Sequence, residues 1–285
     1  MSAVAADAFT AAPVLERLSA RADELRRQWQ SHTLFGYFVC DDFLPADLAE
    51  ALLAVYPPPD LEGWDQTTYP HQRKKFTRRS GFEEPIERFF EMTASPGFLE
   101  RISSITGIRP LHADPLLVGG GLHQSIRGAF LDVHVDFNVH PETRLERRLN
   151  LLLYMNKDWK REYEGCLELW DMNAKKCLAE IAPVFNRAVL FETNDVSYHG
   201  HPKPLNCPQN MSRKSLAVYY YTPSAERVAS EHSTLYRQTT GARGYVKTLA
   251  AAVQAMRERI SGGTVALLAD NLGRRLRGLP PKQRY

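Results

Sequence analysis

The stretch Leu131-Asp-Val-His-Val-Asp-Phe-Asn-Val139 alternates apolar and polar residues with a period of two. This period is typical of a β-strand with one buried face, because successive side chains of a strand point to opposite faces. His134 and Asp136 share the polar face, so an imidazole and a carboxylate lie side by side. The stretch therefore predicts a strand that carries two metal donors.

Further short runs of apolar and β-branched residues surround this strand. They are Leu149 to Tyr154, Cys166 to Trp170, Ala188 to Phe191 and Leu216 to Tyr221. No helical pattern separates them, and this favours an antiparallel sandwich or barrel over a fold of alternating strands and helices. We predict a mainly β core over residues 110–222.

Helical periodicity appears on both sides of this core. Apolar residues recur at helical intervals within 13–30 and 44–55, and again from 246 to 276. We predict that residues 1–109 form a helical or mixed segment packed on the core and that residues 223–285 form a helical extension. The three segments are expected to make a single structural domain.

The composition is that of an ordinary globular protein, with 44% hydrophobic and 24% charged residues among 285. No run approaches the roughly 18 apolar residues of a spanning helix, and the first residues lack the positive charge of a secretory signal. The net charge of +3 does not by itself indicate a polyanionic partner. Since the four cysteines have no C-x-x-C spacing, we expect a cytoplasmic protein that does not bind membranes.

Metal donors have to be chosen among three His-x-acid tripeptides, because nine histidines make a chance match to this short pattern common. The tripeptides are His112-Ala-Asp114, His134-Val-Asp136 and His140-Pro-Glu142. The second lies in a clean alternating strand, whereas Asp114 precedes a proline and the third tripeptide contains one. We expect His134 and Asp136 to be donors, His112 to be structural, and His140 and Glu142 to be exposed at a turn.

A third donor and an anion site follow further along the chain. His199 and His201, at positions i and i+2, come just after a predicted strand. Arg213 and Ser215 share a face of the next strand, and Lys214 points away. A guanidinium with a hydroxyl suits a carboxylate, and a buried arginine without an acidic neighbour in its own strand needs an anion. A bound dicarboxylate would supply it.

A basic stretch lies ahead of the β core. Residues 71–79 contain five Lys or Arg side chains in nine positions. Such a stretch is usually a solvated face or loop; the other interpretation is a rim that attracts an anionic substrate.

Taken in order, five motifs resemble the 2-oxoglutarate- and Fe(II)-dependent oxygenases, and among them the prolyl-4-hydroxylase-like branch. The motifs are His134-Val-Asp136, Arg147 to Asn156 with Trp159, Glu164 to Trp170, His199-Gly200 and Arg213-x-Ser215. The resemblance covers about residues 119–222. It implies a double-stranded β-helix, the jelly roll of these oxygenases, as the core with flanking α-helices.

The resemblance also implies roles for individual residues. The implied Fe(II) ligands are His134, Asp136 and His199, with His199 preferred to His201 because glycine follows it. The implied contacts to the far carboxylate of 2-oxoglutarate are Arg213, Ser215 and Tyr154. Where relatives often carry a tyrosine ahead of the glycine before His-x-Asp, this chain has Ser125 and Ile126.

The implied reaction uses O2 and 2-oxoglutarate, releases succinate and CO2, and hydroxylates a C–H bond. The substrate is expected to be a small molecule, amino-acid-like or peptidyl, since selectivity on this scaffold lies in loops outside the motifs. Asn138, Asn150 and Arg127 are candidate substrate contacts. The motifs do not specify an oligomeric state.

Two other functions compete with this interpretation. A jelly-roll metal-binding protein without oxygenase activity is the first, and Arg213-x-Ser215 argues against it because such a protein needs no carboxylate clamp. A nucleic-acid-directed oxidative demethylase is the second, suggested by the basic stretch. The small net charge and the lack of a nucleic-acid-binding motif argue against a stable nucleic-acid partner.

Overall fold

The structure is a computed structural model that describes residues 11–171, 173–223 and 231–237. The chain divides into two compact units, residues 1–68 with 72–239 and residues 69–71 with 240–285. Apart from residues 69–71, every described residue belongs to the first unit. The helices predicted between residues 246 and 276 lie outside the described residues.

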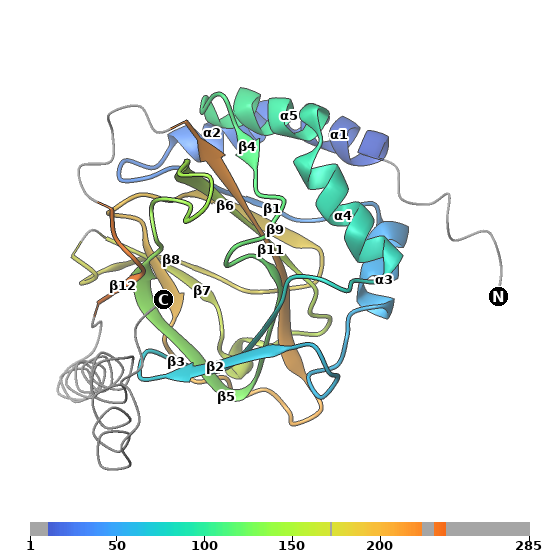
Figure 1. The fold of residues 1–285 in the computed structure, drawn as a ribbon, viewed down its shortest axis with the longest axis vertical. Coiled ribbons are helices and arrows are strands. Elements are labelled where there is room, and N and C mark those ends of the chain that lie inside the picture. Colours follow the sequence, from blue (N-terminus) through green and yellow to red (C-terminus); the bar gives the residue numbers. More distant parts are fainter. Residues whose placement is uncertain (1–10, 172, 224–230, 238–285) are drawn as a thin grey trace, which may run out of the picture. The chain divides into compact units, whose positions relative to one another are not determined.

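The core of the first unit is an antiparallel sheet that curls into a jelly roll (Figure 1). Its main path runs in the order β1 (Tyr37–Cys40), β9 (Arg187–Glu192), β6 (Glu146–Tyr154), β11 (Ser212–Thr222), β5 (Gly121–Val135), β10 (Tyr198–His201), β7 (Leu167–Trp170) and β8 (Cys177–Ile181). The predicted mainly β fold is confirmed.

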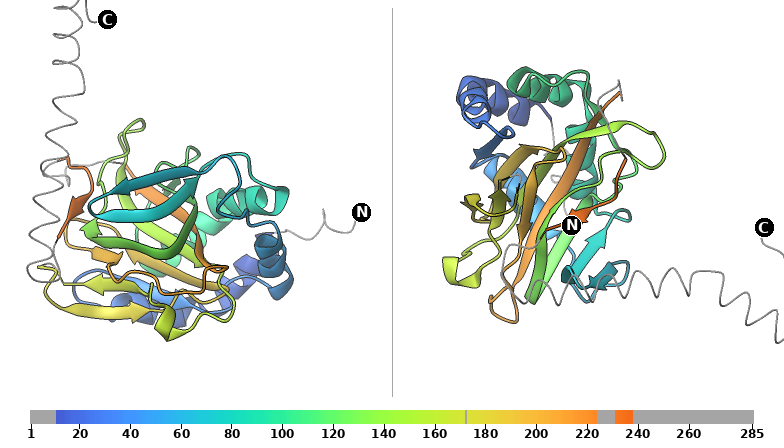
Figure 2. Two further views of the ribbon diagram at one scale, coloured as in Figure 1. Left: turned by 90° about the horizontal axis from the view of Figure 1, so that it is seen from below. Right: turned by 90° about the vertical axis from the view of Figure 1, so that its left-hand side faces the viewer.

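Four further strands join this path at its sides. They are β2 (Asp65–Tyr69), β3 (Gln72–Arg78), β4 (His112–Ala113) and β12 (Leu235–Tyr236). β3 and β12 both pair with β5, and β4 pairs with β11. Figure 2 shows β3 lying beside β5, and β2 pairs with β3. The basic stretch therefore forms a strand at the edge of the core.

The long strand β5 connects the two halves of the core. Its first part, from Gly121 to Ile126, pairs with β11. Its last part pairs with β10, where His134 lies opposite His199. Gly128, at a φ of +82°, lies between the two parts, and glycine tolerates this conformation because it has no Cβ.

In the described part of the chain, five helices cover one face of the sheet: α1 (Ala11–Ala20), α2 (Ala22–Gln30), α3 (Ala46–Ala54), α4 (Glu84–Ala94) and α5 (Pro96–Thr106). The helix expected over residues 13–30 is divided at Arg21, whose guanidinium binds Glu24 and the Asp41 carbonyl. None of the helices in the described part of the chain is long and apolar enough to cross a membrane.

The two faces of the central strands have different roles. Leu216, Val218 and Tyr220 of β11 belong to the hydrophobic cluster that also contains the helix residues Leu18, Leu48 and Phe98. The alternate residues of β11, which include Ala217 and Tyr219, belong to a separate cluster inside the roll. The period-two pattern therefore directs Arg213 and Ser215 toward the interior of the roll, where the candidate site lies.

Candidate metal and cosubstrate site

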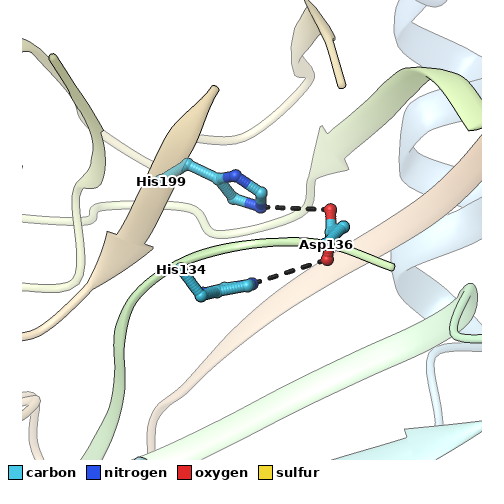
Figure 3. A group of neighbouring side chains, drawn as sticks. All are labelled: His134, Asp136 and His199. Carbon is cyan, nitrogen blue, oxygen red and sulfur yellow. Dashed lines mark ion pairs between the residues drawn. The ribbon is translucent and has the colours of Figure 1, made fainter. Parts of the chain in front are cut away.

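Three side chains meet at the end of β5. His134 is on β5, Asp136 follows the strand by one residue, and His199 is on the paired strand β10 (Figure 3). Their donor atoms all lie within 4.8 Å of one another. Nε2 of His134 is 3.5 Å from Oδ1 of Asp136, and Nε2 of His199 is 3.3 Å from Oδ2. The structure thus brings together the three residues that the sequence singled out.

Hydrogen bonds orient the two imidazoles. Nδ1 of His134 lies 2.8 Å from the Asp132 carbonyl, and Nδ1 of His199 lies 2.9 Å from the Ser197 carbonyl. Because a carbonyl oxygen only accepts, each Nδ1 carries a proton and donates it. Burial, followed by the neighbouring His199, lowers the pKa of His134. The Nε2 atoms of both rings are therefore left to face the carboxylate.

Asp136 is held by an arginine for which the sequence alone predicted no role. Nη2 of Arg147 lies 2.8 Å from Oδ2 of Asp136, and the guanidinium packs 3.4 Å from the centre of the Tyr219 ring. Burial raises the pKa of Asp136, but Arg147 and the facing imidazoles outweigh burial and hold that pKa well below its usual value. The ion pair leaves Oδ1 free of Arg147. In the sequence, the signal for this role of Arg147 was a positive charge at the start of an otherwise apolar strand.

These donors fit a divalent metal ion. Two imidazole nitrogens and a carboxylate oxygen converge at one point, and a cation would relieve the crowding of their lone pairs. Two histidines with one carboxylate are the donor set of non-haem Fe(II) oxygenases, which leaves coordination positions open for other ligands. Residues His134, Asp136 and His199 could therefore hold Fe(II).

The arginine expected to bind a carboxylate lies in the same cavity. Nε of Arg213 donates to the Gly165 carbonyl at 2.7 Å, and Nη2 donates to the Tyr154 hydroxyl at 3.1 Å. Arg213 is 7% exposed and forms no ion pair with any carboxylate in the described residues. Ser215 also lines this cavity, whereas Tyr154, the partner of Arg213, is not among the residues that line it. The guanidinium keeps further N–H donors for an anion.

His201 lies in the cavity but outside the donor cluster. It is buried, and its Nδ1 has no hydrogen-bond partner among the described residues. Burial, and then the charges of Arg213 and Lys75, lower its pKa well below the usual value, so the ring is neutral. The structure brings His199 and not His201 to Asp136.

The remaining His-x-acid tripeptides form a separate structural contact. His140, expected to be exposed, is only 1% exposed, and its Nε2 lies 3.3 Å from Oδ1 of Asp114. That expectation was wrong, because the loop folds the ring against β11 near Tyr221. Asp114 also accepts hydrogen bonds from the backbone N–H groups of Leu116 and Val118. Glu142 is exposed, as expected, and His112 is exposed as well.

Loss of Asp114 is expected to reduce stability without affecting the metal site. Asp114→Ala removes the acceptor of two backbone N–H groups and leaves buried His140 unpaired, which we expect to cost about 2–4 kcal/mol of unfolding free energy. His112→Ala, at an exposed position of the same tripeptide, is the matched control and should change stability by less than about 0.5 kcal/mol. Urea unfolding measures both, and a metal titration should give wild-type affinity for both variants. Weaker metal binding by Asp114→Ala would show that the wrong tripeptide was chosen.

The candidate substrate contacts have different surroundings. Asn150 lines the cavity, and its buried Oδ1 has no hydrogen-bond partner in the part of the chain that the structure describes. Asn138 is buried and accepts a hydrogen bond from the backbone N–H of His232. Arg127 instead lies at the surface and binds the Asn206 and Cys207 carbonyls. Arg127 therefore holds a loop in this structure, and its expected contact with substrate stays a prediction.

Two residues of the site lie in segments whose role the sequence left open or did not indicate. Lys75, within the basic stretch, lines the cavity, whereas Lys74 binds the Arg127 carbonyl and Arg78 binds nearby loop carbonyls. The ring of Tyr236, on β12, lies 5.4 Å from that of His134. Neither residue belongs to a recognisable motif, and only pairing with β5 brings them to the site.

Comparison with known proteins shows which family this core is similar to. Residues 120–221 match the model of the 2OG-Fe(II) oxygenase superfamily. The matched region contains the three donors, Arg213 and Ser215. This region of the chain is therefore similar to that superfamily, and the resemblance indicated by the motifs is confirmed.

The individual relatives include prolyl hydroxylases. Prolyl 3-hydroxylase OGFOD1 of Mus musculus is 30% identical over 92 residues, which are 31% of this chain and 16% of the mouse protein. The chain thus matches about a sixth of that relative's length.

Two solved structures share the fold. One is a prolyl hydroxylase from Trichoplax adhaerens in complex with a hypoxia inducible factor peptide, with a TM-score of 0.55, 17% identity and coverage of 73% of this chain and 91% of that one. The other is a prolyl 4-hydroxylase from Phytophthora capsici, with a TM-score of 0.52, 16% identity and coverage of 85% and 76%. At these identities the likeness concerns the fold, which is the expected oxygenase jelly roll.

Proposed function

We propose that the protein is a 2-oxoglutarate- and Fe(II)-dependent dioxygenase that hydroxylates a C–H bond of an amino-acid-like or peptidyl substrate. One observation carries this proposal: a single buried cavity contains a donor triad suited to Fe(II) and an arginine without a carboxylate partner in the described residues. A metal-binding protein without oxygenase activity would have no use for such an arginine beside the metal.

Each part of the cavity has a distinct task in this function. His134, Asp136 and His199 hold the metal, and Arg147 fixes the orientation of the Asp136 carboxylate. Arg213 and Ser215 bind the far carboxylate of 2-oxoglutarate, so that its keto-acid end reaches the metal. The leucines Leu131, Leu152 and Leu167 line the same cavity and limit access of water.

Bound iron and 2-oxoglutarate would together supply the oxidising power. One O2 is consumed, one oxygen atom enters the substrate as hydroxyl, and the other enters succinate as 2-oxoglutarate loses CO2. Asn150, whose Oδ1 has no partner among the described residues, is available to orient the substrate by a hydrogen bond.

The named relative supports one substrate class. The mouse protein is a prolyl 3-hydroxylase, and this makes a prolyl ring the first candidate for this chain. A proline-containing peptide is therefore the first substrate to test.

Spectroscopy tests the proposed cosubstrate directly. Anaerobic Fe(II) followed by 2-oxoglutarate should produce the weak visible charge-transfer band of a chelated keto acid, and oxygen should then convert 2-oxoglutarate to succinate slowly without substrate. Succinate itself, which has no keto group, is the control and should give no band. Binding of Fe(II) without any band on adding 2-oxoglutarate would favour the metal-binding protein instead.

A further inference from the structure

Lys75 lies in the same row across the sheet as Arg213, the residue expected to bind a carboxylate. It pairs with Ser125 in the β3–β5 ladder, and Ser125 pairs with Arg213 in the β5–β11 ladder. Residues opposite each other in adjacent strands point to the same face of a sheet. Lys75, Ser125 and Arg213 accordingly all line the same cavity.

The register of β3 locates Lys75 along the length of this cavity. Gln72 pairs with Leu131, which also pairs with His201 of β10, whereas Lys75 pairs with Ser125. The ladder is shifted between Arg73 and Lys75, where β5 turns from β11 toward β10. Lys75 therefore enters the cavity beside Ser125 of β5, the strand that also carries His134.

In the part of the chain that the structure describes, the ammonium group of Lys75 has no counter-ion of its own. No ion pair or hydrogen bond of its side chain is found within residues 11–171, 173–223 and 231–237. Burial lowers the pKa of Lys75 to about 8; Asp136 raises it, and Arg213 and Arg147 lower it further. Asp136 is thus its strongest charged neighbour, and that carboxylate is already paired with Arg147.

Binding of an anion would offset the unfavourable buried charge of Lys75. His123 and His201, the titratable groups that face Lys75 from β5 and β10, have strongly lowered pKa values because of burial and nearby cations, so neither compensates it. Two cations in one buried cavity repel each other unless an anion lies between them. A dianion that extends from the metal to Arg213 would pass Lys75.

We propose that Lys75 binds the keto-acid end of the cosubstrate beside the metal, while Arg213 binds the far carboxylate. The proposal rests on the proposed function, because it assumes that 2-oxoglutarate occupies this cavity. It assigns the anion-binding role at the metal end to a strand that carries none of the family's motifs in this chain.

Two keto acids distinguish binding at the metal end of the cavity from binding at the Arg213 end. 2-Oxobutyrate has the keto-acid end of 2-oxoglutarate but lacks the far carboxylate. Calorimetric titration of the Mn(II)-loaded protein should show that Lys75→Met weakens both ligands by about ten- to a hundred-fold, the loss typical of a buried charged contact. Arg213→Lys should weaken 2-oxoglutarate and leave 2-oxobutyrate nearly unchanged.

Matched variants control for indirect effects. Lys74→Met removes a neighbouring ammonium that points to the Arg127 carbonyl and should leave both affinities at wild-type values. Lys75→Gln removes the charge but keeps a polar group. For every variant, retained Mn(II) binding shows that the protein is folded.

Two results would overturn the proposal. Unchanged affinities in Lys75→Met would remove Lys75 from the cosubstrate, and a loss confined to 2-oxoglutarate would assign Lys75 to the far carboxylate. Failure of the wild-type protein to bind either keto acid would instead contradict the proposed function.

Discussion

His199→Ala is expected to abolish tight metal binding and, with it, turnover of 2-oxoglutarate. His199 supplies one of only three donors in the cluster, and its ring is oriented for this task by the Ser197 carbonyl. His134→Ala should behave in the same way. The fold should persist, because the donors project from strands whose pairing does not depend on the side chains. Fe(II) or Mn(II) titration, together with succinate formation, measures the effect.

Asp136 needs a more conservative substitution. Its removal would leave buried Arg147 without a counter-ion, at a cost of about 3–5 kcal/mol of unfolding free energy. Asp136→Asn also removes the charge, but it keeps the shape of the side chain and an oxygen that can accept a hydrogen bond from Arg147, so it should disturb the fold less than Asp136→Ala. Unfolding curves of the metal-free proteins measure how far each variant disturbs the fold.

His201→Ala is the matched control for the donor assignment. His201 lies two residues from His199 and lines the same cavity, but it is outside the donor cluster. The variant should retain metal binding. Retained metal affinity in His199→Ala combined with its loss in His201→Ala would transfer the third donor to His201.

Arg213→Ala is expected to weaken 2-oxoglutarate binding by roughly a hundred-fold or more. A dicarboxylate would lose its buried charged partner, a cost of about 3–5 kcal/mol. The variant would also lose the hydrogen bonds that Arg213 donates to the Tyr154 hydroxyl and the Gly165 carbonyl. Metal affinity should change little because the three donors are separate side chains.

Arg213→Lys and Tyr154→Phe give a graded series. The lysine restores the charge but not the planar fork, so it should recover only part of the affinity. Tyr154→Phe removes one hydrogen bond to Arg213 and should cost about 1 kcal/mol. Calorimetry on the metal-loaded variants measures all three. Equal affinity for 2-oxoglutarate in wild type and Arg213→Ala would remove Arg213 from the site and with it the main reason for preferring this cosubstrate.

Local sequence patterns determined the features that repeat along a single strand. The alternation around His134 and Asp136 predicted both the strand and the shared face, because a period of two is a property of the strand itself. The same reasoning placed Arg213 and Ser215 on one face of a later strand. The mainly β core and its flanking N-terminal helices were predictable for the same reason.

The tertiary structure decided which side chains meet across strands. The pairing of Arg147 with Asp136, of His140 with Asp114, and the place of Lys75 in the cavity each depend on how separate segments fold together. A one-residue change of register would turn a side chain to the opposite face, and no local pattern specifies the register between segments distant in the chain. His140 illustrates the result: beside a proline in a turn it resembled a surface residue, and the packing of its loop buried it.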